Sequence, residues 1–208
     1  MPRLKEAGRE AENGFANALF DMVFGAGVDP LKSDTPSGSP GDWWTVFNIV
    51  PDAFKHAVEG FAFYQSTDRK IAPKLRELGQ IRAGYAVGSK FVYSQHCKTA
   101  RQLGFSEEQI AAIPNWQVAE CFDAQERAVL AYVDGLVLQH GRVSDATFAA
   151  LKEHLSDEEI LELSYITCTY MMHGIMSKAL HLEFDNVPDR IVEVDAPNGN
   201  NVGVLGDA

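Results

Sequence analysis

The chain has 208 residues, of which 46% are hydrophobic, and its formal net charge at pH 7 is −11. This length suits a single domain with a substantial buried core. Because nucleic acids and anionic membranes bind basic surfaces, the acidic balance argues against both as partners. A small anionic substrate needs only one or two local cations, so the net charge does not exclude a substrate of this kind.

The most apolar stretch of the chain, ELSYITCTYMMHGIMSKAL, still carries Glu162, His173 and Lys178. It therefore predicts a buried helix rather than a membrane span. The first fifteen residues hold no apolar run long enough for a signal peptide. The three cysteines are an odd number without CxxC spacing, which argues against a disulfide framework or a zinc site. We expect a cytoplasmic protein without a zinc site.

In chain order, residues 3–24 predict a first helix, and the Gly-, Pro- and Ser-rich residues 25–42 predict a linker. Pro51 and Pro73 each suit the first turn of a following helix, since proline lacks the amide hydrogen that this turn leaves unbonded. The chain after residue 42 therefore begins with two predicted helices.

The later helices are marked by signals at their ends. Gly88 followed by Ser89 predicts a helix end and a new start, and Gly104 predicts the next end. Three capping boxes predict further helix starts: Ser106–Gln109, Asp123–Glu126 and Ser156–Glu159. No alternation typical of strands is visible, so we predict an all-α, single-domain bundle of about eight helices.

The predicted organisation has three parts. Residues 1–42 form an N-terminal helix and linker, and residues 43–187 form the helical domain. Residues 188–208 form an extended tail, because this segment is rich in Pro, Gly and Asn.

The segment FVYSQHCKTARQLGFSEEQI places His96 directly before Cys97. Adjacent residues of a helix point about 100° apart, so the two side chains do not face each other as a base and its thiol nucleophile would. We therefore interpret Cys97 as a small, partly buried thiol. For His96 two interpretations stay open, a satisfied core histidine or a residue of an active site.

Glu77 favours the active-site interpretation of His96. This carboxylate lies on a largely apolar side of its predicted helix, where a buried charge is costly unless it is paired. The turn at Gly88 and Ser89 folds this helix back on the helix of His96. An acid and an imidazole are thus expected to converge between two helices, which is an arrangement for general acid/base catalysis.

Other side chains near this turn are candidates for substrate binding. Arg82 is a candidate anchor for a carboxylate, although a solvated helix face is the more ordinary interpretation. Tyr85 and Tyr93 are candidate donors to a developing enolate, or they simply pack. Ser89 is a further candidate at the turn, and His173 is either a pocket wall or a core histidine.

The stretch RELGQIRAGYAVGSKFVYSQHCKTARQLGFSEEQIAAI resembles the core motif of the carboxymuconolactone decarboxylase and alkylhydroperoxidase-D-like superfamily. Glu77 and His96 match the family glutamate and histidine, and Ala100 and Gly104 match the trailing small residues. The similarity covers about 145 residues, from Trp43 onward. The resemblance implies an alkylhydroperoxidase-D-like helical fold.

The peroxidase branch of this superfamily carries a CxxC pair where this chain has Ser89 and Val92. A thiol cycle needs two cysteines within disulfide reach, and Cys97 stands at neither position. The chain therefore resembles the decarboxylase branch more closely. That resemblance implies cofactor-independent acid/base chemistry on a small, oxygen-rich ring compound from aromatic degradation, often a carboxylated one.

The leading hypothesis is thus a lyase, decarboxylase or isomerase in which His96 transfers the proton and Glu77 assists it. One alternative is a thiol peroxidase that uses Cys97, and another is a non-catalytic helical module that binds a small molecule. We also expect a homo-oligomer, a trimer or hexamer, from the resemblance and from large apolar side chains that a thin helical layer does not bury. These are Phe54, Phe61, Phe63, Tyr64, Met171, Met172 and Met176.

Overall fold

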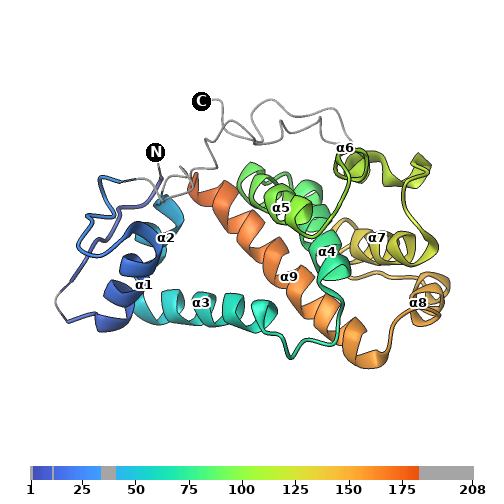
Figure 1. Cartoon of the computed structure of the whole chain (residues 1–208), viewed down its shortest axis with the longest axis horizontal. Coiled ribbons are helices and arrows are strands. Elements are labelled where there is room, and N and C mark those ends of the chain that lie inside the picture. The colour runs from blue at the N-terminus through green and yellow to red at the C-terminus, as the bar shows by residue number, and fades with distance from the viewer. Residues whose placement is uncertain (1, 11, 34–40, 183–208) are drawn as a thin grey trace. The chain divides into compact units, whose positions relative to one another are not determined.

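A computed structural model describes residues 2–10, 12–33 and 41–182 of the chain. Within these ranges the fold consists of nine α-helices and one 3-10 helix, without a strand, which confirms the all-α prediction (Figure 1). The predicted C-terminal tail lies outside the described residues. The elements are α1 (Gly14–Phe24), α2 (Asp42–Phe47), α3 (Pro51–Gln65), α4 (Pro73–Ala86), α5 (Lys90–Gln102), α6 (Glu107–Ala112), η1 (Ile113–Val118), α7 (Ala124–Val137), α8 (Asp145–Lys152) and α9 (Asp157–Leu180).

Contacts between residues divide the chain into two compact units. The N-terminal unit contains the described residues up to Ser66 together with residues 179–182, and the bundle unit contains Thr67–Lys178. The three parts expected from the sequence, with boundaries after residues 42 and 187, remain a prediction. None of the described helices is long and apolar enough to span a membrane.

The N-terminal unit has an aromatic core made by α1, α2 and α3. Phe20 and Phe54 are completely buried, and their rings lie 6.1 Å apart. Trp43 is also buried and stacks on Phe47 at 4.2 Å between ring centroids. The predicted surface role of Phe54 is therefore wrong, because this side chain fills the core of its own unit.

The first helix starts later than predicted, at Gly14 instead of residue 3, and Asn13 caps its first turn. The segment before it bonds to other parts of the unit. The Ala7 amide donates to the Thr45 carbonyl at 2.9 Å. The Arg9 side chain donates to the Val28 carbonyl at 2.8 Å. In a helix the Ala7 amide would donate to the carbonyl four residues earlier instead of to Thr45, so tertiary hydrogen bonds override the helical pattern here.

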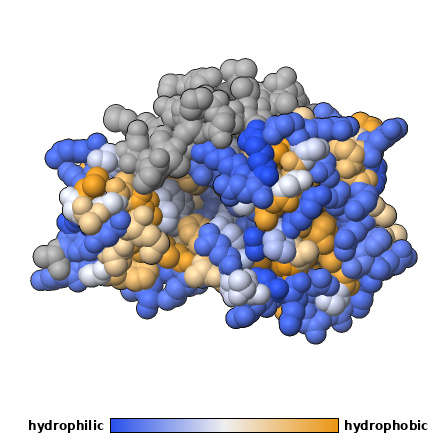
Figure 2. Space-filling view, in the orientation of Figure 1, coloured by the Kyte–Doolittle hydropathy of each residue, from blue (hydrophilic) through white to orange (hydrophobic). Residues whose placement is uncertain are grey.

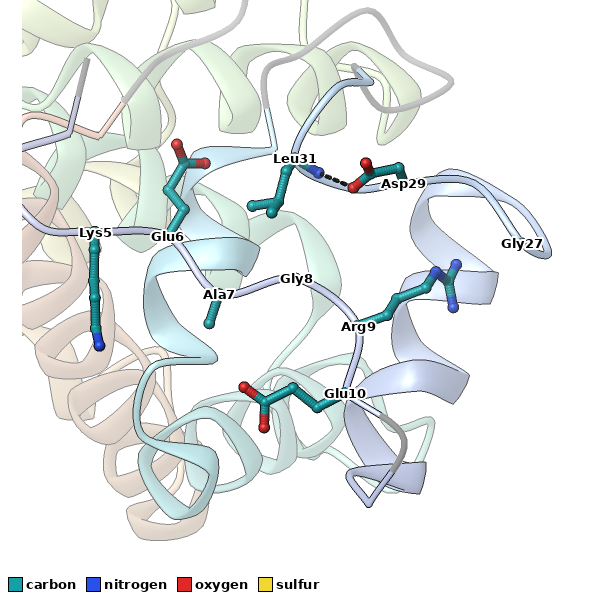
Figure 3. Close-up of a pocket in the computed structure, with 9 residues that line it drawn as sticks. All are labelled: Lys5, Glu6, Ala7, Gly8, Arg9, Glu10, Gly27, Asp29 and Leu31. Atoms are coloured by element: carbon teal, nitrogen blue, oxygen red, sulfur yellow. Dashed lines mark hydrogen bonds between the residues drawn. The ribbon is translucent and has the colours of Figure 1, made fainter.

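The same segment lines an open pocket of about 530 Å³ (Figure 3). Its charged groups serve the local fold: Arg9 forms an ion pair with Asp21 at 2.8 Å, and Glu6 accepts from the Thr45 hydroxyl at 2.7 Å. Asp29 accepts from the Leu31 amide at 3.1 Å. We therefore assign this pocket a structural role. Its lining residues are Lys5, Glu6, Ala7, Gly8, Arg9, Glu10, Gly27, Asp29 and Leu31.

The bundle unit is organised around α4, which packs against α5 and α7 (Figure 1). Ten of the fourteen residues of α4 are buried. The predicted helix starts and ends are confirmed. Pro73 begins α4, and Ser89 caps the start of α5. Gly88 and Gly104, which follow the ends of α4 and α5, have φ angles of +69° and +84°. All three predicted capping boxes form as well.

Glycines let the helices of the bundle unit approach closely. A Cβ atom at Gly79 would lie 2.9 Å from both Leu163 and Thr167 of α9, and one at Gly84 would lie 3.0 Å from the Tyr93 amide of α5. A larger residue at Gly84 has to push the backbone of α5 away, whereas one at Gly79 has to displace the Leu163 and Thr167 side chains of α9. The two glycines thus allow α5 and α9 to pack closely against α4.

Arg82 is buried and tied to α7, so both interpretations from the sequence, a carboxylate anchor and a solvated face, are wrong. Its guanidinium binds Asp134 through two hydrogen bonds of 2.6 and 3.0 Å. Another of its nitrogens donates to the Ile113 carbonyl at 3.0 Å. Because Asp134 also accepts from the indole of Trp116 at 3.0 Å, the ion pair joins α4, α7 and η1.

We predict that Asp134→Ala lowers the free energy of unfolding by about 3–5 kcal/mol, because it leaves the buried Arg82 charge without its partner. Urea unfolding followed by circular dichroism measures the change. Glu59→Gln, which breaks the exposed pair between Lys55 and Glu59, is the control and should have little effect. A loss for Asp134→Ala no larger than that of the control contradicts the prediction.

Candidate active site

Glu77 and His96 meet in the interior of the bundle unit. Oε1 of Glu77 lies 2.5 Å from Nδ1 of His96, and the two residues are 0% and 6% exposed. The predicted convergence of the two side chains is therefore confirmed. Such a contact holds the imidazole in one orientation and directs its second nitrogen, Nε2, away from the carboxylate.

The helical hairpin of α4 and α5 creates this contact. The Ser89 hydroxyl accepts from the Val92 amide at 3.3 Å and so caps the start of α5 directly after the turn. Ser89 is buried, and a Cβ atom added at Gly174 of α9 would lie 3.3 Å from the Cβ atom of Ser89. Ser89 thus has a structural role at the turn, and substrate binding by its hydroxyl remains a prediction.

Helix α9 closes the other side of the site. The ring of Tyr170 meets the ring of His96 edge to face at 4.4 Å between centroids. The ring of His173 lies 6.2 Å from that of Tyr170. The structure therefore brings His173, which is buried, into the same group of rings as His96. Tyr170 was missed as a candidate, although its spacing of three residues from His173 places both on one helical face.

Two further buried polar residues beside the pair were missed. Gln80 and Thr167 are both completely buried, and neither side chain forms a hydrogen bond within the described structure. The second oxygen of Glu77, Oε2, has no hydrogen-bond partner either. The position of Gln80, three residues after Glu77, was the available signal, because residues three apart share a helical face.

The candidate tyrosines lie near Arg82 and Cys97. The rings of Tyr85 and Tyr93 are 5.9 Å apart, and the Arg82 guanidinium lies 5.3 Å from the centre of the Tyr85 ring. Tyr93 also hydrogen-bonds to the Cys97 thiol. Both tyrosines are buried and serve the packing of α4 on α5. Their role as donors to a substrate remains a prediction.

Cys97 is an unreactive thiol in these surroundings. It is completely buried, and burial raises the pKa of its thiol to about 12. A thiol with this pKa carries almost no thiolate at neutral pH, and the thiolate is the nucleophilic form. Within the described ranges, no three His, Cys, Asp or Glu side chains gather in a way that would bind a metal ion.

Comparison with known proteins relates the chain to one protein family. Residues 52–135 match the Carboxymuconolactone decarboxylase family, which confirms the predicted resemblance to the carboxymuconolactone decarboxylase and alkylhydroperoxidase-D-like superfamily. The chain is 25% identical over 121 residues to the uncharacterized protein YdfG of Bacillus subtilis strain 168. That similarity covers 58% of this chain and 81% of YdfG.

Solved structures share the fold. ATU0492 of Agrobacterium tumefaciens, a protein of unknown function proposed to be the antioxidant defence protein AhpD, is 25% identical with a TM-score of 0.63. The match covers 67% of this chain and 94% of ATU0492. The debrominase Bmp8 has a TM-score of 0.68 at 14% identity, over 88% of this chain and 93% of Bmp8. Bmp8 therefore supports the fold assignment alone.

We predict that acidification destabilises the protein through His173. Burial lowers the pKa of this ring from 6.5 to about 4, so between these pH values the unfolded chain binds more protons than the folded chain. The contribution of His173 to the free energy of unfolding is therefore fully present above about pH 6.5 and is lost as the pH decreases toward 4. By about pH 5 the contribution lost is about 2 kcal/mol, at about 1.4 kcal/mol per pKa unit.

Urea unfolding of the wild type and His173→Leu at pH 7 and pH 5 measures this contribution. The wild type should lose more stability than His173→Leu over this interval, because leucine takes up no proton. His154→Leu, at an exposed position, is the matched control and should follow the wild type. Equal losses in the wild type and His173→Leu would contradict the prediction.

Proposed function

We propose that the protein is a cofactor-independent acid/base enzyme, a lyase, decarboxylase or isomerase of the carboxymuconolactone decarboxylase type. Its substrate is a small oxygenated compound of the kind formed in aromatic degradation. The observation that carries the proposal is the buried contact of 2.5 Å between Glu77 and His96. A carboxylate and an imidazole held together away from water are suited to moving a proton at a carbon beside a carbonyl group.

In this mechanism His96 transfers the proton and Glu77 supports it. With Nδ1 bound to Glu77, the neutral imidazole holds its lone pair on Nε2 and takes the substrate proton there. The carboxylate then stabilises the imidazolium that forms and keeps the ring oriented. In an isomerisation the proton is returned from Nε2 to another atom of the same substrate. In a decarboxylation the imidazolium instead gives its proton to the carbanion or enolate that remains when CO2 leaves, and the imidazole then takes a new proton from solvent. Neither route needs an oxidant or reductant.

The state of Cys97 favours this chemistry over a thiol peroxidase. A peroxidatic cysteine has to be a thiolate that peroxide can reach, and Cys97 is buried with a raised pKa. Ser89 and Val92 stand where the peroxidase branch has its two cysteines. An alkylhydroperoxidase activity based on Cys97 is therefore the weaker alternative.

The third function, a binding module without catalysis, uses the same site. A variant of Bmp8 with one cysteine replaced by alanine forms a complex with 2,3,4-tribromopyrrole, and Bmp8 shares the fold of this chain at a TM-score of 0.65 in that structure. A fold of this kind is thus compatible with a small flat ring as ligand. Tight binding of a ring compound without any turnover would favour the binding module over the enzyme.

We also propose that the protein forms homo-oligomers, with trimers or hexamers as the assemblies that the family resemblance implies. Support comes from α9, where apolar side chains recur every three or four residues on an exposed stripe. An apolar stripe of this kind is suited to packing against a second copy of the chain. Its members are Leu161, Tyr165, Cys168, Met172 and Ile175. Figure 2 shows that apolar patches interrupt the polar surface on the face it displays.

We predict that His96→Ala abolishes turnover while the circular dichroism spectrum stays unchanged. Glu77→Gln should lower kcat and change its pH profile, because the neutral amide does not stabilise the imidazolium. Steady-state kinetics on lactones and ring-cleavage products, screened first with the wild type, give the measurement. Cys97→Ser is the control and should retain activity. Robust hydroperoxide turnover that vanishes in Cys97→Ser would refute the acid/base proposal.

We predict a molar mass by light scattering of a small multiple of the chain mass, 22.9 kDa. Introducing charges on α9 with Leu161→Lys and Ile175→Lys should lower this mass, because buried charges oppose the apolar contact. Leu138→Lys, at an exposed leucine outside α9, is the matched control and should leave the mass unchanged. A wild type that stays monomeric across micromolar concentrations overturns the assembly proposal.

A further inference from the structure

Gln80 is a completely buried side chain whose amide forms no hydrogen bond at either polar atom within the described structure. This state is unusual, because buried polar groups of folded proteins nearly always have a partner. Two other buried polar residues of α4 differ from it: Arg82 is held by Asp134 and by the Ile113 carbonyl, and Glu77 is engaged at one oxygen by His96. An amide kept in this position therefore points to a bound molecule as its partner.

The position of Gln80 on α4 places its amide beside the candidate active site. Each residue of a helix turns by about 100°, so Gln80 lies about 60° around the helix from Glu77 and about 100° from Gly79. Glu77 faces His96 of α5, and Gly79 faces Thr167 of α9. Gln80 thus lies between these two directions, where α4, α5 and α9 meet.

Two other polar groups at this junction, like the Gln80 amide, have no hydrogen-bond partner among the described residues. The Thr167 hydroxyl would lie 2.9 Å from a Cβ atom at Gly79, the residue before Gln80, and it has no hydrogen-bond partner within the described structure. Oε2 of Glu77 has none either. An amide, a hydroxyl and a carboxylate oxygen, on two helices, are therefore available to one small molecule next to His96.

The chemistry of these groups selects the ligand. The amide nitrogen of Gln80 donates to a carbonyl oxygen, while its oxygen accepts from a hydroxyl, and the Thr167 hydroxyl does either. A carboxylate would be repelled by Glu77, and Arg82 does not neutralise it because Asp134 already holds that guanidinium. The site therefore suits a neutral oxygen function.

We infer that Gln80, together with Thr167, binds a neutral carbonyl or hydroxyl group of the substrate and holds it against the Glu77–His96 pair. This inference rests on the proposed acid/base function and narrows its substrate class. The buried end of the substrate is a lactone, ketone, enol or phenol rather than a carboxylate. Any carboxylate of the substrate lies at its other end.

The test uses three small probes: 2(5H)-furanone for the lactone carbonyl, phenol for the hydroxyl, and benzoate for the carboxylate. NMR titration gives their dissociation constants with the wild type and with Gln80→Met, which keeps the length of the side chain but not its hydrogen bonds. The wild type should bind the furanone and phenol more tightly than benzoate. Gln80→Met should weaken both neutral probes about tenfold, as the loss of one buried hydrogen bond implies.

Two further measurements separate a binding role from a structural one. Gln102→Met, at an exposed position of α5, should leave all three affinities unchanged. The unfolding temperature of Gln80→Met should equal or exceed that of the wild type, because the substitution removes a buried amide without a partner. A residue needed only for packing would lower the unfolding temperature instead.

The inference is overturned if no neutral probe binds the wild type, if benzoate binds most tightly, or if Gln80→Met changes the affinities by less than about twofold. It is also overturned if Gln80→Met lowers the unfolding temperature and all three affinities together. Turnover by His96→Ala decides the proposed function separately. Activity retained in that variant refutes the acid/base mechanism, whereas the probe affinities alone decide the role of Gln80.

Discussion

The burial of α4 is the constraint on which the bundle unit depends. Ten of its fourteen residues are buried, and three of these, Glu77, Gln80 and Arg82, have strongly polar side chains. A polar group in such a place costs free energy unless something binds it. Among the described residues, Arg82 is bound by Asp134, Glu77 is bound at one oxygen, and Gln80 is bound at neither atom. The number of polar atoms bonded within the protein thus decreases from Arg82 to Gln80. We interpret the bonded atoms as structural and propose that the others bind a substrate.

The close approach of the helices links that constraint to the geometry of the site. At Gly79 and Gly84 a Cβ atom would collide with α9 and α5, respectively. Close packing of α5 and α9 against α4 accompanies the contact of the His96 and Tyr170 rings at 4.4 Å between centroids. The two glycines therefore affect both the packing of the helices and the geometry of the candidate site. A larger side chain at either glycine would change the site as well as the stability.

Local features of this fold were predictable from the sequence, and long-range pairings were not. The capping box of Ser106 and the turn at Gly88 depend only on neighbouring residues, so both were found. The Glu77–His96 contact was found because one short turn joins its two helices. Arg82 and Asp134 are 52 residues apart, and no spacing rule pairs them. The helix predicted from residue 3 begins only at Gly14 for the same reason, because Ala7 and Arg9 bond to distant carbonyls.

The Glu77–His96 contact does not involve a cysteine, which is consistent with the proposed chemistry. The pair is set by the spacing of nineteen residues across the hairpin. Ser89 occupies the first position where the peroxidase branch has a cysteine, and its hydroxyl caps α5 there. Val92 occupies the second and packs toward Gly84. Both positions thus contribute to the hairpin that brings the acid and the imidazole together, so the Glu77–His96 contact forms with Ser89 and Val92 in these places.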